Sequence, residues 1–249
     1  MTPVLSAAGV TAAILVWAAV TAAGVVPAQT LPGPAPVAAR VVTLLGDHEF
    51  QEQVLDTLTT WVLALGITGV VAVPIGLLIG YFAFLGRPTE LVIHGLRSVP
   101  STALLPVAIL FFGLGLQMKF AMVAYAIVWP LLLNTAYGVR SVDPTTMYVA
   151  RSLRWSTLRS LVRVVLPSAA PGIAIGFRVA GGIGLVVVLS AELLGASRGI
   201  GTVLVRYQQS DQPDFVYAGI VLVGALGILL QYTLAQLERR LIPWSPAAR

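Results

Sequence analysis

The sequence predicts an all-α membrane protein, a class indicated by its composition, its hydrophobic runs and the placement of its charges. Of the 249 residues, 57% are hydrophobic and only 10% are charged, with a mean hydropathy of +0.91. Soluble domains carry roughly 25% charged residues, so this chain has too few polar side chains to cover a soluble globule. It contains no cysteine, which excludes disulfide bonds and thiolate metal sites.

Six hydrophobic runs are predicted to cross the bilayer, since a transmembrane helix needs ~20 mostly apolar residues. The first run, residues 4–26, contains no charge. A cleavable signal peptide is the alternative there, but Met1, Thr2 and Pro3 provide no basic side chain before the apolar core, which favours a retained span. The other predicted spans are residues 61–85, 102–116, 120–137, 172–194 and 215–237.

The regions between these runs suggest a division of the chain. Residues 1–37 comprise the first span and a proline-rich connector, and residues 38–249 form the main membrane core with a large loop at 139–171. Residues 47–60 are polar enough to predict a surface helix before the second span.

Basic residues predict the orientation, because cytoplasmic loops of membrane proteins are enriched in Lys and Arg. With both termini in the cytoplasm, more basic residues fall inside than outside. The outer loops then hold Arg40, Lys119, Arg198 and Arg206. This placement explains the net charge of +5 without a nucleic-acid partner.

The segment YVARSLRWSTLRSLVRVVLPSAAP, residues 148–171, lies in the large inner loop. Residues 148–164 contain neither Gly nor Pro, and Leu153, Leu158 and Leu161 mark an apolar stripe that predicts a basic amphipathic helix. Pro167 and Pro171 predict a bend after it. Such a helix either lies on anionic membrane lipid or docks a cytoplasmic partner.

The same segment resembles the cytoplasmic loop of bacterial ATP-binding-cassette importer permeases. Their pattern is Glu-Ala-Ala, three residues, Gly, nine residues, Ile, one residue and Leu-Pro. Leu166-Pro167 matches its end, and Val164 takes the place of Ile. Tyr148 and Arg154 stand where the pattern has Glu and Gly.

Further stretches are similar to the branch of this family that imports sulfonates, taurine, nitrate and related small solutes. They are RSVPSTALLPVAILFFGLG, WPLLLNTAYGVRSVDP, PGIAIGFRVAGG, SAELLGASRGIGTVL and LERRLIPW. The resemblance implies a type I importer permease fold with an extra N-terminal helix, located in the bacterial inner membrane. It also implies alternating access as the mechanism.

The resemblance implies several partners: cytoplasmic ATPase subunits that carry ATP and Mg, a second copy of the permease or a related permease, and an extracytoplasmic solute-binding protein. The loop would insert a coupling helix into the ATPase. The residues implied in coupling are Tyr148, Val149, Ala150, Arg151, Ser152, Leu153, Arg154, Trp155, Ser156, Leu166 and Pro167.

The chain itself is not expected to be an enzyme or to bind a cofactor or metal. A P-loop needs a Gly-rich turn followed by Lys and then Ser or Thr. The lone lysine, Lys119 in GLGLQMKF, has neither after it. His48 and His94 do not belong to a ligand-spaced cluster.

Three polar residues within the predicted spans, Asn134, Arg178 and Glu192, are candidates for the solute path, because polar groups in a membrane are costly and often functional. Structural roles are the alternatives: an interhelical hydrogen bond for Asn134, snorkelling for Arg178 and an anchor of the outer loop for Glu192. That outer loop, GASRGIGTVL, either re-enters the membrane or lies on its surface.

Two other functions stay open from the residues alone. A secondary transporter would need intramembrane ionisable groups, for which only Arg178 and Glu192 qualify. A non-transporting membrane scaffold would fit the departures at Tyr148 and Arg154. Those departures also fit an importer in which this chain pairs with a more typical permease, or one whose ATPase has a compensating surface.

Overall fold

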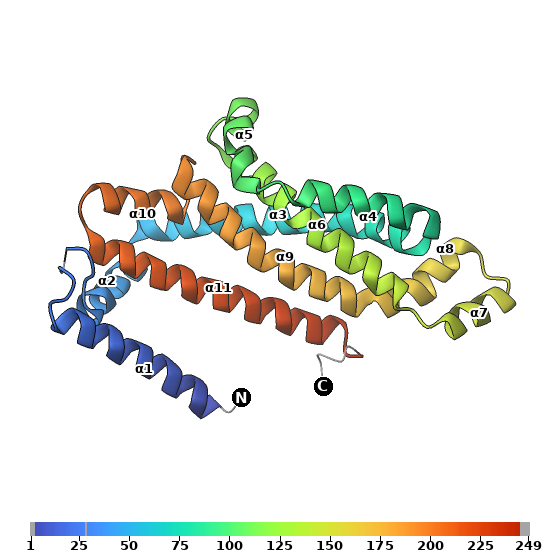
Figure 1. The fold of residues 1–249 in the computed structure, drawn as a ribbon, viewed down its shortest axis with the longest axis horizontal. Coiled ribbons are helices and arrows are strands. Elements are labelled where there is room, and N and C mark those ends of the chain that lie inside the picture. The colour runs from blue at the N-terminus through green and yellow to red at the C-terminus, as the bar shows by residue number, and fades with distance from the viewer. Residues whose placement is uncertain (1–2, 28, 245–249) are drawn as a thin grey trace. The chain divides into compact units, whose positions relative to one another are not determined.

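The computed structural model describes residues 3–27 and 29–244, and every regular element in them is a helix (Figure 1). The N-terminal helices are α1 (Pro3–Ala22), α2 (Pro34–Gly46), α3 (His48–Tyr81) and α4 (Ala83–Arg97). The central elements are η1 (Ser101–Leu104), α5 (Leu105–Phe112), α6 (Leu116–Arg140), α7 (Pro144–Ser152) and α8 (Thr157–Ser160). The chain continues through η2 (Leu161–Val165), α9 (Leu166–Leu194), α10 (Ile200–Gln209) and α11 (Pro213–Leu241). The predicted all-α class is confirmed.

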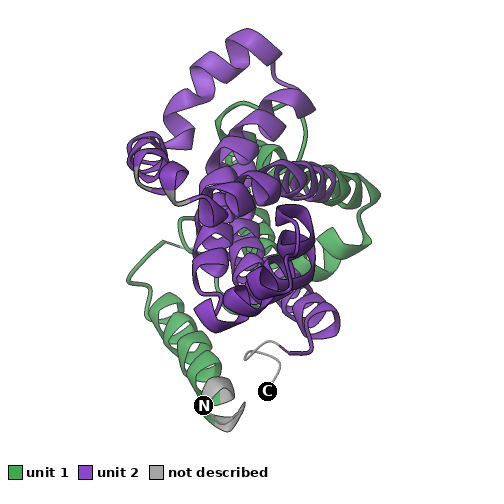
Figure 2. Cartoon of the chain, turned by 90° about the vertical axis from the view of Figure 1, so that its right-hand side faces the viewer, with its two compact units in different colours: residues 1–57, 192–226 green, residues 58–191, 227–249 purple. Residues whose placement is uncertain are grey.

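The chain forms two compact units, coloured separately in Figure 2. Unit 1 comprises residues 1–57 and 192–226, and unit 2 comprises residues 58–191 and 227–249. Each unit therefore combines segments that are far apart in the sequence.

Glycines bring the backbones of α3, α6 and α9 together in unit 2. A Cβ on Gly80 of α3 would lie 2.8 Å from the Ala136 carbonyl oxygen of α6. A Cβ on Gly172 of α9 would lie 2.9 Å from the Cα atom of Gly138, also in α6. Both distances are too short for any side chain, so these helices pack through their backbones, as small residues allow in membranes.

A buried tryptophan joins α3 to the middle of α9. The indole Nε1–H of Trp61 donates a 2.8 Å hydrogen bond to the Gly181 carbonyl. A Cβ on Gly181 would also meet Leu234 of α11 at 2.5 Å. Because Gly181 has no side chain, both Trp61 and Leu234 can pack against it.

Unit 1 is held together by polar and aromatic contacts. Arg40 of α2 pairs with Asp214 at 2.6 Å and lies over the ring of Phe215, 4.6 Å from its centroid. Tyr207 of α10 stacks on the same ring at 4.7 Å. The guanidinium of Arg40 therefore fixes the start of α11 against α2, while Tyr207 adds α10 to the cluster.

Four helical segments in the described part of the chain are long and apolar enough to cross a membrane, judged by length and composition: His48–Tyr81, Leu116–Arg140, Thr157–Leu194 and Pro213–Leu241. A helix pair bent by 71°, Phe84–Arg97 with Ser101–Phe112, gives a fifth if it is counted as one broken span. The apolar stretch Ala8–Ala22 of α1 is shorter. The count of six spans stays a prediction.

Two predicted element boundaries are wrong. Residues 47–60 are not a separate surface helix, because α3 runs unbroken from His48 to Tyr81, with Thr57 and Thr60 completely buried. Residues 102–116 are not one straight helix either. They contain the short helices η1 and α5, and the preceding loop of the prediction is largely helix α4.

Candidate functional site

Helix α7 occupies the position of the expected coupling helix, and the local sequence explains where it begins. The carboxylate of Asp143 accepts a 2.9 Å hydrogen bond from the backbone N–H of Thr145. Pro144 follows at the first helical position, where its missing N–H costs nothing. An N-cap followed by proline therefore starts this helix in the middle of a long connection.

The C-terminus of α7 is a Schellman motif whose left-handed residue is Arg154, with φ of 52°. The Arg154 N–H bonds the Arg151 carbonyl at 2.9 Å, and the Trp155 N–H bonds the Ala150 carbonyl at 3.1 Å. Glycine is the usual residue at this position because it lacks the Cβ that the left-handed conformation disfavours. This geometry gives a physical reason for the Gly of the family pattern. It also shows that Arg154 keeps the same backbone turn without it.

One face of α7 is packed and the other is open. Ala150 is only 2% exposed. Met147 packs on a buried cluster centred on Val139, Val165 and Ala169. By contrast, the open face presents Tyr148, Val149 and Leu153, which are 64%, 55% and 59% exposed. Three exposed apolar side chains on a helix fixed to the protein core form a surface suited to a partner.

The chain turns between α7 and α8, and the arginines of α8 and η2 pack on the tryptophan of this turn. Ser156 caps α8 by accepting a hydrogen bond from the Arg159 N–H at 3.4 Å. The guanidinium of Arg159 lies over the Trp155 ring, 4.7 Å from its centroid, and that of Arg163 lies at 6.0 Å. The predicted continuous helix over 148–164 is therefore wrong, because the chain turns at residues 153–156 and starts a new helix.

Beyond this turn, the chain stays helical through Pro167, the residue at which the sequence predicts a bend. Residues Leu161–Val165 form a π-helical turn, and the Leu166 N–H bonds the Leu161 carbonyl. Proline lacks an N–H and collides with the carbonyl four residues earlier, here that of Arg163. The wider turn accommodates this ring, so that Thr157–Leu194 is one continuous helical segment. The Pro167 carbonyl also accepts a 3.1 Å hydrogen bond from the Trp244 indole.

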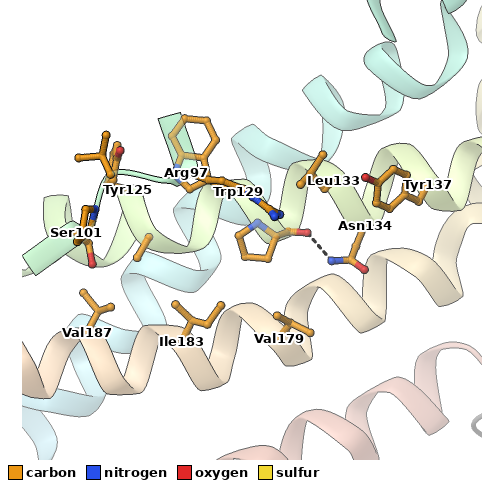
Figure 3. A pocket seen from close by; sticks show the side chains of 14 residues that line it. Arg97, Ser101, Tyr125, Trp129, Leu133, Asn134, Tyr137, Val179, Ile183 and Val187 are labelled. Carbon is orange, nitrogen blue, oxygen red and sulfur yellow. Dashed lines mark hydrogen bonds between the residues drawn. The ribbon is translucent and has the colours of Figure 1, made fainter. Parts of the chain in front are cut away.

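A cavity of about 490 Å³ lies between α6, α9 and the segment that links α4 to η1 (Figure 3). Asn134 lines it and donates a 2.8 Å hydrogen bond to the Pro130 carbonyl. The other polar residues on its wall are Arg97, Ser101, Tyr125, Trp129 and Tyr137. Of the three path candidates, Asn134 is the one that faces this cavity.

Arg178 has a different environment within unit 2. Its guanidinium pairs at 3.3 Å with Glu238 of α11, whose side chain is 3% exposed against 43% for Arg178. The Gln231 amide donates to the Arg178 carbonyl at 3.2 Å. These contacts tie α9 to α11, and they involve a side-chain carboxylate rather than the helix-end carbonyls that snorkelling would use.

Glu192 lies in unit 1 and is 1% exposed. Its carboxylate accepts hydrogen bonds from the Thr57 hydroxyl at 3.0 Å and from the Gly201 N–H at 3.1 Å. The Thr57 oxygen in turn accepts from the Ile200 N–H at 3.0 Å, and the Gln53 side chain accepts from the Gly199 N–H at 2.7 Å. Three consecutive N–H groups at the start of α10 are thereby satisfied, so the irregular residues 195–199 lead into a helix whose first turn is anchored.

The C-terminal part of α10 is fixed by an ion pair. Arg206 pairs with Glu49, and this hydrogen bond raises the pKa of Arg206. Burial, followed by the carboxylates of Asp47 and Glu49, raises the pKa of Tyr207. Both ends of α10 are therefore bound to the first turns of α3.

Sequence reasoning missed several of these residues. Lys119 was assigned to an outer loop, yet it is a fully buried residue of α6, at 1% exposure. Thr57 and Glu238 were passed over because a single polar residue in an apolar run gives no sign of its partner. Polar residues lie among apolar ones around Trp129 and Asn134. This was the sequence pattern that could have predicted a cavity-lining face.

Comparison with known proteins agrees with this geometry. Residues 72–243 match the family described as "Binding-protein-dependent transport system inner membrane component". The chain is 31% identical to the taurine transport system permease protein TauC of Escherichia coli (strain K12), covering 93% of this chain and 86% of TauC. It is 32% identical to the bicarbonate transport system permease protein CmpB of Synechococcus elongatus (strain ATCC 33912 / PCC 7942 / FACHB-805), covering 75% and 68%.

The fold also has a counterpart among solved structures. A chain of the MetNI methionine ABC transporter in an inward-facing conformation superimposes with a TM-score of 0.68 at 19% identity, covering 76% of this chain and 94% of the other. The family match extends over more than half of the sequence and includes α7, the cavity and Glu192, but not its partner Thr57. The chain belongs to the family of binding-protein-dependent transport system inner membrane components, as a permease subunit of an ATP-binding-cassette importer.

Proposed function

We propose that this permease moves a small anionic solute into the cell by alternating access, driven by ATPase subunits that dock on α7. ATP and Mg would be held by those subunits. A second copy of this chain or a related permease would complete the path, and an extracytoplasmic binding protein would deliver the solute.

The observation that carries this proposal is the open apolar face of α7, formed by Tyr148, Val149 and Leu153. These side chains project from a helix that is capped at both ends and packed on a buried cluster through Met147. A displacement of α7 would therefore be transmitted to α6 and α9 rather than absorbed locally.

The topology follows from this role. With α7 in the cytoplasm, and with α1 and the bent pair Phe84–Arg97 and Ser101–Phe112 each counted as a span, both termini also lie there, and the α10 region faces the outside. The excess of Lys and Arg in the inner loops supports this orientation.

The choice of an anionic solute rests on two supports. CmpB is named for bicarbonate, which is an anion, and TauC for taurine, which carries an anionic sulfonate beside an ammonium group. The cavity beside Asn134 also contains an arginine and no acidic residue among its lining side chains.

The test is co-purification of this chain with the ATP-binding subunit encoded next to it, with stoichiometry determined by native mass spectrometry. Val149→Asp places a charge on the open face and is expected to abolish ATPase binding, while the helical circular dichroism stays unchanged because Val149 is 55% exposed. Leu158→Asp is the matched control, since Leu158 is 72% exposed but lies in α8, outside the α7 face. Failure of the unmodified chain to bind the ATPase, or equal binding by Val149→Asp, would refute the proposal.

A further inference from the structure

A separate cavity of about 470 Å³ lies in unit 2 beside α7 and is called the α7 cavity below. Three aromatic residues from the connection between α3 and α4 line it, namely Tyr81, Phe82 and Phe84, together with Arg151 of α7. Met147, which packs α7 on the buried aliphatic cluster, borders the same cavity. A molecule bound here would therefore touch both the membrane helices and the side of α7 that is turned away from its open face.

The α7 cavity lies where three membrane-spanning segments end. The α3 segment ends at Tyr81, the α6 segment ends at Arg140, and the segment that contains α9 begins at Thr157. With α7 in the cytoplasm, these ends lie near the head groups of the inner lipid leaflet. Aromatic side chains are enriched at this level of a membrane protein, because their rings suit the boundary between head groups and acyl chains.

The charge of the α7 cavity is positive and uncompensated. Arg151 is the one charged residue in its lining, and it makes no ion pair with a carboxylate in the part of the chain that the structure describes. Glu90 and Asp143 are the only acidic residues between positions 57 and 191. Glu90 pairs with Arg140, and Asp143 accepts the hydrogen bond that caps α7. An anion is therefore the ligand that this guanidinium would attract.

The combination of an arginine with aromatic rings matches the upper part of a phospholipid. A guanidinium binds phosphate oxygens through two parallel hydrogen bonds, and the rings offer an apolar surface to the glycerol esters and the first methylene groups. The lining contains no carboxylate that could pair with the ammonium group of a zwitterionic head group. Basic pockets between helices on the cytoplasmic side of membrane proteins are known to hold anionic head groups.

We propose that the α7 cavity binds the phosphate of an anionic phospholipid from the inner leaflet, and that this lipid holds α7 in the position needed for coupling. The sequence left open whether the basic segment contacts lipid or a cytoplasmic partner. In this proposal it does both, with the open face toward the partner and the opposite side toward the lipid. The lipid site does not depend on the proposed transport function, whereas its effect on coupling does.

Lipid binding is measured on the full permease in detergent by native mass spectrometry, with dioleoylphosphatidylglycerol and dioleoylphosphatidylcholine as the probes. One phosphatidylglycerol per chain is expected to bind about fivefold more tightly than phosphatidylcholine, as one additional charge contact at the membrane surface provides. Glycerol 3-phosphate, which has the phosphate but no acyl chains, is expected not to displace it. Displacement by this compound would show that the site takes a soluble phosphate instead, and would overturn the proposal.

Variants assign the bound lipid to the α7 cavity. Arg151→Gln is expected to lower phosphatidylglycerol affinity by about fivefold, and Phe82→Ala by about threefold, since it removes an apolar ring from the wall. Arg154→Gln is the matched control, because Arg154 is an exposed arginine of the same segment that does not line the cavity. Equal losses in Arg151→Gln and Arg154→Gln would mean diffuse attraction to a basic surface and would refute the site. Where Arg151→Gln does not fold, Phe82→Ala and the glycerol 3-phosphate competition decide.

The effect on coupling is measured as ATP hydrolysis by the co-purified permease–ATPase complex in nanodiscs of phosphatidylcholine with and without phosphatidylglycerol. Phosphatidylglycerol is expected to stimulate hydrolysis, and the ratio between the two lipid mixtures is expected to fall to one in Arg151→Gln. This ratio separates lipid dependence from a general loss of ATPase docking, which would lower hydrolysis in both mixtures alike. Equal hydrolysis by the unmodified complex in both mixtures would refute the role of the lipid in coupling. If the ATPase does not co-purify, the transport proposal fails, and the lipid titration of the permease alone still decides the site.

Discussion

The hydroxyl group of Thr57 lies 3.0 Å from both carboxylate oxygens of Glu192, although the two residues are 135 positions apart. Both side chains are inaccessible to solvent, with Thr57 at 0% and Glu192 at 1% exposure. Together they satisfy the N–H groups of Ile200 and Gly201 at the start of α10. A carboxylate at the N-terminus of a helix is also favoured by the helix dipole. Within unit 1, this pair therefore defines where α10 begins.

Removal of the carboxylate is expected to loosen α10. Glu192→Ala leaves the Gly201 N–H without its carboxylate acceptor and the Thr57 hydroxyl with the Gln53 carbonyl alone, and the loss of stability should be about 1–3 kcal/mol. Glu192→Gln keeps one acceptor oxygen and should lose about half as much. Thermal unfolding in nanodiscs measures both, and hydrogen exchange at residues 199–201 should accelerate in the Ala variant. The control is Glu52→Gln, because the Glu52 side chain is 63% exposed; an equal shift in that variant would contradict the assignment.

Gly199 is expected to tolerate no side chain. Its φ is +120°, and a Cβ would lie 2.0 Å from the Glu192 carboxyl carbon. Gly199→Ala should therefore destabilise the protein by about 2 kcal/mol or more, through backbone strain and through displacement of Glu192. The matched control is Gly224→Ala in α11, where nothing lies within 4 Å and the gain in helix propensity is about 1 kcal/mol. Midpoints of thermal unfolding that shift in the same direction would refute this explanation.

Arg154→Gly is expected to stabilise the coupling segment. The left-handed conformation costs a residue with a Cβ about 1 kcal/mol, which glycine avoids. Arg154→Ala separates backbone from charge, because it removes the guanidinium and keeps the Cβ. The exchange rate of the Trp155 amide, which closes the Schellman motif, should fall in the Gly variant and not in the Ala variant. Identical rates in the two variants would show that the charge matters and the turn does not.

The helix contacts in unit 2 predict that replacement by alanine lowers stability much more at one glycine than at another. A Cβ on Gly138 would lie 2.9 Å from the Ala169 carbonyl oxygen, which as a backbone atom cannot rotate away. Gly138→Ala should cost about 1–3 kcal/mol by forcing α6 and α9 apart. Gly66→Ala in α3 has open space around it and should be neutral or slightly stabilising. Comparison of unfolding midpoints and of ATPase co-purification would check both; a stable Gly138→Ala variant would mean that the two helices are not in contact.

The features of this protein that could be predicted from the sequence are those that depend on residues close together in the chain. Long apolar runs predicted the α3, α6, α9 and α11 helices, and the ordered motifs predicted the permease family, both of which are confirmed. Such local patterns do not indicate which side chains contact each other in the folded protein. The contact between Thr57 and Glu192, or between Arg178 and Glu238, depends on tertiary packing and has no counterpart in periodicity.

The errors also have physical causes. Lys119 lies between the predicted spans 102–116 and 120–137 and was therefore assigned to a loop, yet it is buried in α6. The bend predicted from Pro167 is not among the errors, because a π-helical turn at residues 161–165 precedes this proline and such turns are sites of helix bending. The roles of α7 and of the cavity stay predictions until they are tested.

The glycine contacts also determine how stiff the bundle is. Side chains that interlock can change rotamer and absorb a small displacement, whereas backbone atoms in direct contact have no such freedom. Around Gly80, Gly138 and Gly172, α3, α6 and α9 touch through their main chains. α7 packs on the same region through Met147. These helices are therefore expected to move together. A displacement of α7 would be passed on to α6 and α9, which line the Asn134 cavity, with little local deformation.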